Sequence, residues 1–264
     1  MAPFFTGITR GIGGGGFSKR FVKLIPFSAT GGTISTPGDG YKYHSFTSPG
    51  NFDVTGTVKV QAEIAMVGGG GNGGTPQGDG GPGNYDSGSG GGGGGAFAYF
   101  AFELSGDSSG TTLNYNITAG GASSPTSFTS PNVSVIAGGG TAGPPSYRSD
   151  VPGGPGGTVS NPSNIPTIRS TSGVNGSGTL GADQAGPGGA AGHTSNRLGE
   201  WWIPYMGPGE GGLGNFPAGT PGTPGTSYGG GGGGGAGQGG DPPQPEIGQG
   251  GSGTPGRIVI RYLV

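Results

Sequence analysis

The chain has 264 residues, of which 73 are glycine and 24 are proline. The combined share of glycine and proline lies well above the ~25–30 % that marks an unusual composition. Charged residues make up only 9 %, and the formal net charge is −2, which argues against a nucleic-acid-binding surface. Cysteine is absent, which excludes disulfides and thiolate metal sites.

Such a composition is compatible with collagen, with low-complexity disorder or with an ordered glycine-rich fold. Collagen needs glycine at every third position, and only short pieces such as 219–225 satisfy this. Disorder is typical of highly charged chains, whereas this chain has few charges and gathers its apolar residues into short runs. No apolar run approaches the ~18–20 residues of a membrane span, so we expect none. The start of the chain lacks the long apolar region of a secretory signal.

Residues 1–27 differ in composition from the rest and form the first expected unit, with one domain at 28–264. Cations and phenylalanines alternate there, and no acidic residue precedes Asp39. One interpretation is a frayed terminus with incidental charge. The other is a docking arm that buries aromatic rings against a partner protein, with the candidates Phe4, Phe5, Arg10, Phe17, Lys19, Arg20, Phe21 and Lys23.

Alternating apolar residues predict β-strands from residue 41 onward. Segment 57–67 is the clearest, because its apolar side chains recur at every second position and so share one face, as expected for Val58, Val60, Ala62, Ile64 and Met66. We find no amphipathic helix of ten residues. Further strands are expected at 41–47, 96–104, 112–118, 126–130, 132–138 and 257–264.

Long glycine tracts separate these strands, so the last strand must find partners near residues 60 and 100. The tracts must therefore leave the sheet and return to it. Glycine can form the left-handed polyproline II helix, and such helices can exchange backbone hydrogen bonds when glycine lies inward and proline outward. We expect an all-β fold, a small antiparallel β-sandwich with long glycine-rich excursions packed as polyproline or polyglycine II helices. Gly229–Gly235 would be one such helix, and disordered loops are the alternative.

The order of segments resembles a known pattern. Residues 29–56 are similar to the opening of the glycine-rich domain of tailed-phage tail and virion proteins, many of them marine. A later strand running into glycines at 58–71, the segments at 90–105, 113–121 and 127–140, and the closing 253–262 also match in order. The matching opening positions are Ala29, Thr30, Gly31, Gly32, Tyr41, Lys42, His44, Phe46, Thr47, Gly50, Phe52 and Val54.

This resemblance implies a virion structural protein of a tailed phage, most often a tail fibre or tip adhesin that contributes to host attachment. A head-surface fibre or capsid decoration protein is the alternative within the same class. A free ice-binding protein is the alternative from another class, since packed glycine helices also present flat faces. The expected partners are other virion proteins, a host receptor (a glycan or an outer-membrane protein) and further copies of the chain, with a trimer assumed.

The sequence offers no catalytic constellation, cofactor site or metal site, so we expect a protein that is not an enzyme. Matches to G-x-G-x-x-G are frequent only because glycine is frequent, and no expected helix follows them. The acidic residues are scattered, so no glycosidase pair can be inferred from their spacing. Of the two histidines, His44 lies in an expected strand and is interpreted as structural.

Segment 196–216 is the most informative stretch outside the strands, because it holds both tryptophans. Exposed rings there have two interpretations. They cap the glycine helices or contact a neighbouring subunit, or they recognise a sugar or surface protein, since aromatic residues and arginine are the usual hot spots. The receptor-binding candidates are Arg197, Trp201, Trp202, Tyr205 and Phe216, with Tyr147 and Arg148 from a second loop.

Overall fold

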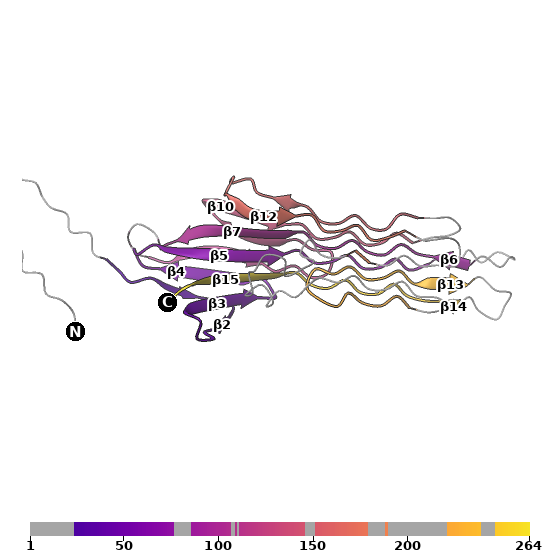
Figure 1. Cartoon of the computed structure of the whole chain (residues 1–264), viewed down its shortest axis with the longest axis horizontal. Coiled ribbons are helices and arrows are strands. Elements are labelled where there is room, and N and C mark those ends of the chain that lie inside the picture. Colours follow the sequence, from indigo (N-terminus) through magenta and orange to yellow (C-terminus); the bar gives the residue numbers. More distant parts are fainter. Residues whose placement is uncertain are drawn as a thin grey trace, which may run out of the picture.

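The computed structural model describes residues 24–76, 86–106, 109, 111–145, 151–178, 188–189, 221–238 and 246–264. Within these residues the fold is all-β, with two antiparallel six-stranded sheets and a small three-stranded sheet. The two large sheets form a sandwich at one end of an elongated molecule (Figure 1). Long segments run side by side from the sandwich to the other end, where the small sheet lies (Figure 1).

The described strands fall into three sheets, and the strands of each sheet follow in spatial order from one edge to the other. The first sheet contains β1 (Ser28–Thr30), β4 (Gly50–Thr55), β8 (Leu113–Thr118), β9 (Thr126–Ser130), β10 (Val133–Ala137) and β11 (Val159–Ser160). The second contains β12 (Thr167–Thr171), β7 (Phe97–Leu104), β5 (Val60–Val67), β15 (Arg257–Leu263), β3 (Tyr41–Phe46) and β2 (Thr33–Ser35). The small sheet contains β14 (Glu246–Ile247), β13 (Ala236–Gln238) and β6 (Asp86–Gly88).

The apolar faces predicted from the alternation form the core between the two large sheets. Val60, Ala62, Ile64 and Met66 of β5 all lie in this core or against it. Aromatic rings from both sheets fill its centre, where Tyr115 and Phe128 stack at 5.0 Å and Phe100 contacts Phe128 at 6.0 Å. The prediction for Val58 was wrong, because β5 begins at Val60 and leaves Val58 38 % exposed.

The last strand occupies the middle of the second sheet. β15 pairs antiparallel with β5 on one side, which confirms the partner expected near residue 60. Its other partner is β3. The partner expected near residue 100 was wrong, because β7 pairs with the far edge of β5 and so lies one strand away from β15.

His44 is a structural residue of the core, fully buried between the two sheets. Its Nδ1 lies 2.8 Å from the carbonyl oxygen of Gly31. A carbonyl can only accept, so Nδ1 carries the proton. Nε2 then accepts from the Tyr262 hydroxyl at 3.1 Å. The contact joins two positions of the opening motif, His44 and Gly31. Gly31 has a φ of 111°, a conformation that favours glycine.

The glycine tracts form a lattice of extended segments beyond the sandwich. Segment 89–96 lies at its centre, and every residue of it is buried. Its N–H groups donate in turn to three neighbours, the segments 138–144, 172–178 and 229–235. The order of the three acceptor segments repeats after every third residue, as a helix with three residues per turn requires. The bonds run from Gly91 to Ser177, Gly92 to Gly232, Gly93 to Thr141, Gly94 to Val174, Gly95 to Gly229 and Ala96 to Gly138, at 2.8 to 3.1 Å.

The carbonyl groups of segment 89–96 accept from three further neighbours. Gly71 of segment 68–76 donates to Gly93, and Gly154 of segment 151–158 donates to Gly91. The third donor is Gly189, which bonds Gly92 at 2.7 Å. Segment 89–96 is therefore surrounded by six segments, of which three accept from it and three donate to it. The predicted packing of polyglycine II helices is confirmed.

Position in the lattice decides where side chains are allowed. The two segments that consist almost wholly of glycine, 89–96 and 229–235, are buried throughout. Peripheral segments alternate buried glycines with exposed residues, and most of the prolines point outward, as expected, among them Pro152, Pro155, Pro221, Pro224 and Pro255. A Cβ added to Gly232 would overlap the carbonyl oxygen of Gly251. The run Gly229–Gly235 is thus one helix of the lattice and not a linker.

We expect Gly232→Val to destabilise the fold by about 1–3 kcal/mol or more, because backbone on the neighbouring segment cannot yield to the new side chain. Ser252→Val is the matched control, since Ser252 is exposed on the adjacent segment. Chemical denaturation of the two variants measures the difference. Equal stabilities for both variants would contradict the packing of Gly229–Gly235.

We also expect the free energy of unfolding to fall in mild acid because of His44. Burial lowers the pKa of His44 below the ordinary value of 6.5, so the folded protein holds the ring neutral while the unfolded chain takes up a proton. The stabilisation is complete above pH 6.5 and is lost as the pH falls from there to the lower folded pKa. Denaturation at a series of pH values, compared with His44→Gln, checks this. An unchanged slope in the variant would assign the effect to other groups.

Candidate functional site

All of the site residues predicted from the sequence lie outside the described residues. This holds for the docking candidates in residues 1–23, for Tyr147 and Arg148, and for every candidate in segment 196–216. The structure does show where the chain enters these segments. Segments 138–145 and 151–158, on either side of Tyr147 and Arg148, end at the far end of the lattice (Figure 1). The roles of these residues stay predictions.

The described residues contain a different surface of interest, the face of the second large sheet that points away from the sandwich. We refer to it as the outer face. It holds a second apolar cluster, separate from the main core, with Tyr41 and Tyr228 packed against it. The alternation of β3, β5, β7 and β15 places these side chains opposite those of the core. The buried members are Tyr43, Ala65, Val67, Phe97, Tyr99 and Val259.

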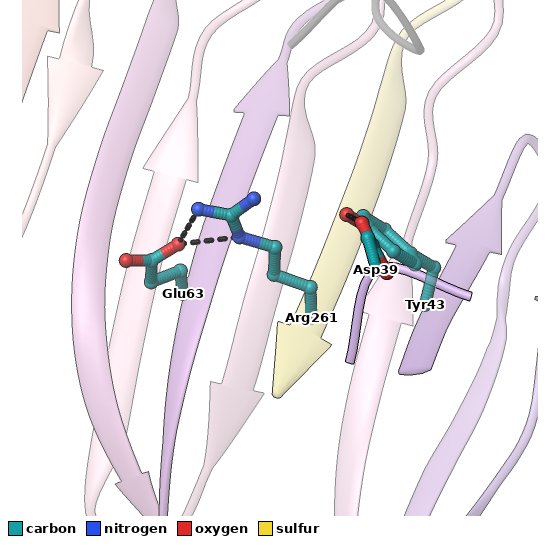
Figure 2. A network of polar contacts seen from close by, with 4 residues as sticks. All are labelled: Asp39, Tyr43, Glu63 and Arg261. Carbon is teal, nitrogen blue, oxygen red and sulfur yellow. Dashed lines mark hydrogen bonds and ion pairs between the residues drawn. The ribbon is translucent and has the colours of Figure 1, made fainter. Parts of the chain in front are cut away.

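A buried cation lies at the centre of the outer face. The Nε of Arg261 on β15 donates to Oε2 of Glu63 on β5 at 2.5 Å, and its Nη2 contacts the same oxygen (Figure 2). The guanidinium carbon also lies 4.4 Å from the centre of the Tyr41 ring. The Arg261 side chain is only 10 % exposed, so it is held by an anion and by the face of an aromatic ring.

Asp39 and Tyr43 form a second polar pair on the other side of Arg261 (Figure 2). The Tyr43 hydroxyl donates to Asp39 Oδ2 at 2.5 Å, and Asp39 Oδ1 accepts from the N–H of Tyr41. The hydrogen bond from Tyr43 lowers the pKa of the Asp39 carboxyl. Burial and the adjacent carboxylate raise the pKa of the Tyr43 hydroxyl. The pair therefore remains a charged acceptor and a neutral donor around neutral pH.

A groove beside these residues is lined mainly by residues that carry a hydroxyl group. It has a volume of about 280 Å³, and its lining residues are Thr33, Ser35, Tyr43, Ser45, Thr47, Arg257 and Val259. Antiparallel pairing sets its floor, because Thr33 lies opposite Ser45 and Ser35 opposite Tyr43. Arg257 donates from Nε to Ser45 Oγ at 3.0 Å, and its guanidinium carbon lies 4.9 Å from the centre of the Tyr228 ring.

The side chains of the outer face and of the groove offer hydrogen-bonding and ring-stacking contacts. Hydroxyls, ring faces and held guanidinium groups hydrogen-bond and stack. The one histidine in the described part of the chain, His44, is buried in the core and bonded on both ring nitrogens. No group of three histidine, cysteine or acidic side chains in the described ranges could hold a metal ion. The described ranges also contain no helix with the length and apolar character of a membrane crossing.

Sequence reasoning missed the outer face because it followed one face of each strand. The signal was available, since the strands of the second sheet contain continuous apolar runs at 64–67, 96–102 and 258–260. Such runs are typical of strands that are buried on both faces. Arg261 was not singled out either, because nothing in the sequence shows that its neighbour across the strands is Glu63.

We expect Arg261→Ala to destabilise the protein by about 1–3 kcal/mol, because it removes a charged hydrogen bond and a ring contact from a largely buried position. The matched control is Lys59→Ala, which breaks the ion pair with Glu103. That pair is 64 % and 45 % exposed, so its loss should cost less than about 1 kcal/mol. Thermal or denaturant unfolding measures both. A larger loss in the control would show that burial does not govern the strength of these pairs.

No protein-family model and no curated protein matches the chain.

Proposed function

We propose that the protein is a non-enzymatic structural protein of a tailed-phage virion, a tail fibre or tail-tip protein that contributes to host attachment. The observation that carries the proposal is the glycine lattice. It is a hydrogen-bonded body whose interior consists almost wholly of glycine backbone, built out from a small sandwich (Figure 1). Such a body suits a protein that must hold loops rigidly at a distance from its anchor.

The lattice supports loop presentation because it fixes both ends of each connection. Segment 68–76 runs outward from β5 and segment 89–96 runs back to β7. The same holds for segments 138–145 and 151–158 between β10 and β11. Each pair is bonded to its neighbours at every turn of the helix, so the points where the connecting residues leave are set by backbone geometry. Residues between these points can vary in sequence at little cost to the fold.

The first described residues support an anchoring role for the segment before them. The carbonyl of Ile25 accepts from the N–H groups of Thr57 and Val58. Phe27 packs against the core and meets the Tyr262 ring edge-on at 5.0 Å. The chain is therefore attached to the sandwich from residue 25 onward, while Leu24 is 73 % exposed. The described chain therefore begins at the sandwich, the end opposite the small sheet (Figure 1).

Deletion of residues 1–23 is expected to abolish incorporation into particles and to leave the folded domain intact, because Ile25 and Phe27 are retained. Incorporation is measured by immunoblotting purified particles, and the fold by circular dichroism of the isolated domain. Labelled antibody on intact particles shows whether the protein lies on the tail or the head. Normal incorporation of the shortened protein would rule out the docking arm.

Replacement of Trp201 and Trp202 by alanine is expected to reduce adsorption to host cells about tenfold or more, since aromatic hot spots contribute about 2 kcal/mol or more each. The matched control is Pro155→Ala, at an exposed position on the lattice. Adsorption rate constants of particles carrying each variant give the comparison. Unchanged adsorption with a folded protein would favour the structural interpretation of segment 196–216.

A further inference from the structure

The glycine lattice must end somewhere, and its outermost segments have N–H groups that point away from it. In segment 248–256, the N–H groups of Gly251 and Thr254 donate inward to segment 229–235. The N–H groups of Gly250 and Gly253 precede them by one residue each. With three residues per turn they point about 120° away, toward the position where the lattice would continue.

Side chains from the adjacent segment occupy this position. Gly253 N donates to Asn72 Oδ1 at 2.9 Å, and Gly250 N donates to Thr75 Oγ1 at 3.2 Å. Asn72 and Thr75 lie on segment 68–76, which is bonded to segment 248–256 through its own backbone. Both residues are exposed, and they are separated by the same three-residue interval as the two glycines. The two side chains therefore satisfy one continuous row of donors.

The same arrangement recurs on another side of the lattice. In segment 151–158, Gly154 and Gly157 donate inward to segment 89–96. Gly156, which lies between them, donates to Asn175 Oδ1 at 2.9 Å. Asn175 is exposed and belongs to segment 172–178, the neighbour that bonds segment 151–158 through Gly173 and Gly176.

An asparagine side chain ends in an amide, the same group that a further glycine helix would offer to these donors. Glycine rows with open donors are the lattice equivalent of the unpaired edge of a β-sheet, which recruits strands from other molecules unless it is blocked. A second copy of this chain is the obvious source of glycine helices. Its segments have the required three-residue repeat.

We propose that Asn72, Thr75 and Asn175 close the glycine lattice, so that glycine helices of a second copy cannot add to it at these two sides. The inference goes beyond the proposed function and does not depend on it. It implies that copies of this chain that associate with one another meet through surfaces other than these two sides of the lattice.

The test is the triple variant Asn72→Gly, Thr75→Gly, Asn175→Gly in the full chain. All three positions are exposed, so glycine fits there without overlap and leaves the donors of Gly156, Gly250 and Gly253 open. We expect the weight-average mass in light scattering to at least double relative to the unaltered protein, with a further rise as concentration increases. An unchanged mass over the same concentrations overturns the proposal.

The matched control is Ala142→Gly with Ser177→Gly, two exposed positions on the lattice. It adds glycine at the lattice surface and keeps the three closing side chains. We expect its mass to equal that of the unaltered protein, and equal association of control and triple variant also overturns the proposal. Hydrogen exchange separates lattice addition from aggregation of unfolded chain. In lattice addition the amides of Gly250 and Gly253 are protected in the associated species, and their loss of protection counts against the proposal.

Discussion

The whole structure depends on one interaction, the hydrogen bond between backbone N–H and C=O groups of neighbouring glycine helices. A polyproline II helix makes no hydrogen bonds within itself, so an isolated one leaves its polar groups to water. Ordering glycine costs more conformational entropy than ordering any other residue. The six neighbours around segment 89–96 offset both costs. They pair its backbone polar groups, and they hold its conformation from every side. The absence of Cβ atoms allows the backbones to approach this closely.

The sandwich makes this lattice possible. A glycine segment carries no side chains that could define its register against a neighbour. Register is set instead at the base, where each segment continues from a strand whose pairing is fixed by alternation of side chains. β5, for example, is held between β7 and β15 before the chain continues into segment 68–76. The same sheet has apolar side chains on both faces. On the outer face, aromatic rings and the Arg261–Glu63 ion pair lie among them.

Much of the fold could be predicted from the sequence, because its signals are local. Alternation indicated the inward face of β5 and the positions of the other long strands, and the conformational range of glycine and proline indicated the inward and outward positions of the lattice. The partners of β15 could be predicted only in part, since the order of strands depends on contacts between distant residues. The candidate surface residues were chosen by composition. The outer face was missed because Tyr43, Arg261 and Glu63 meet only after three strands have paired.

The central place of β15 also bears on how the protein is made. This strand inserts between β3 and β5, which leave the ribosome long before it. Segment 229–235 likewise bonds segments 68–76 and 89–96, which are synthesised much earlier. Neither the sheet nor the lattice can close until residues 257–263 have been synthesised. Contacts between such distant residues are slow to form. The growing chain therefore carries open strand edges and unpaired glycine tracts through most of its synthesis, and protection of these nascent segments becomes a requirement for production of the protein.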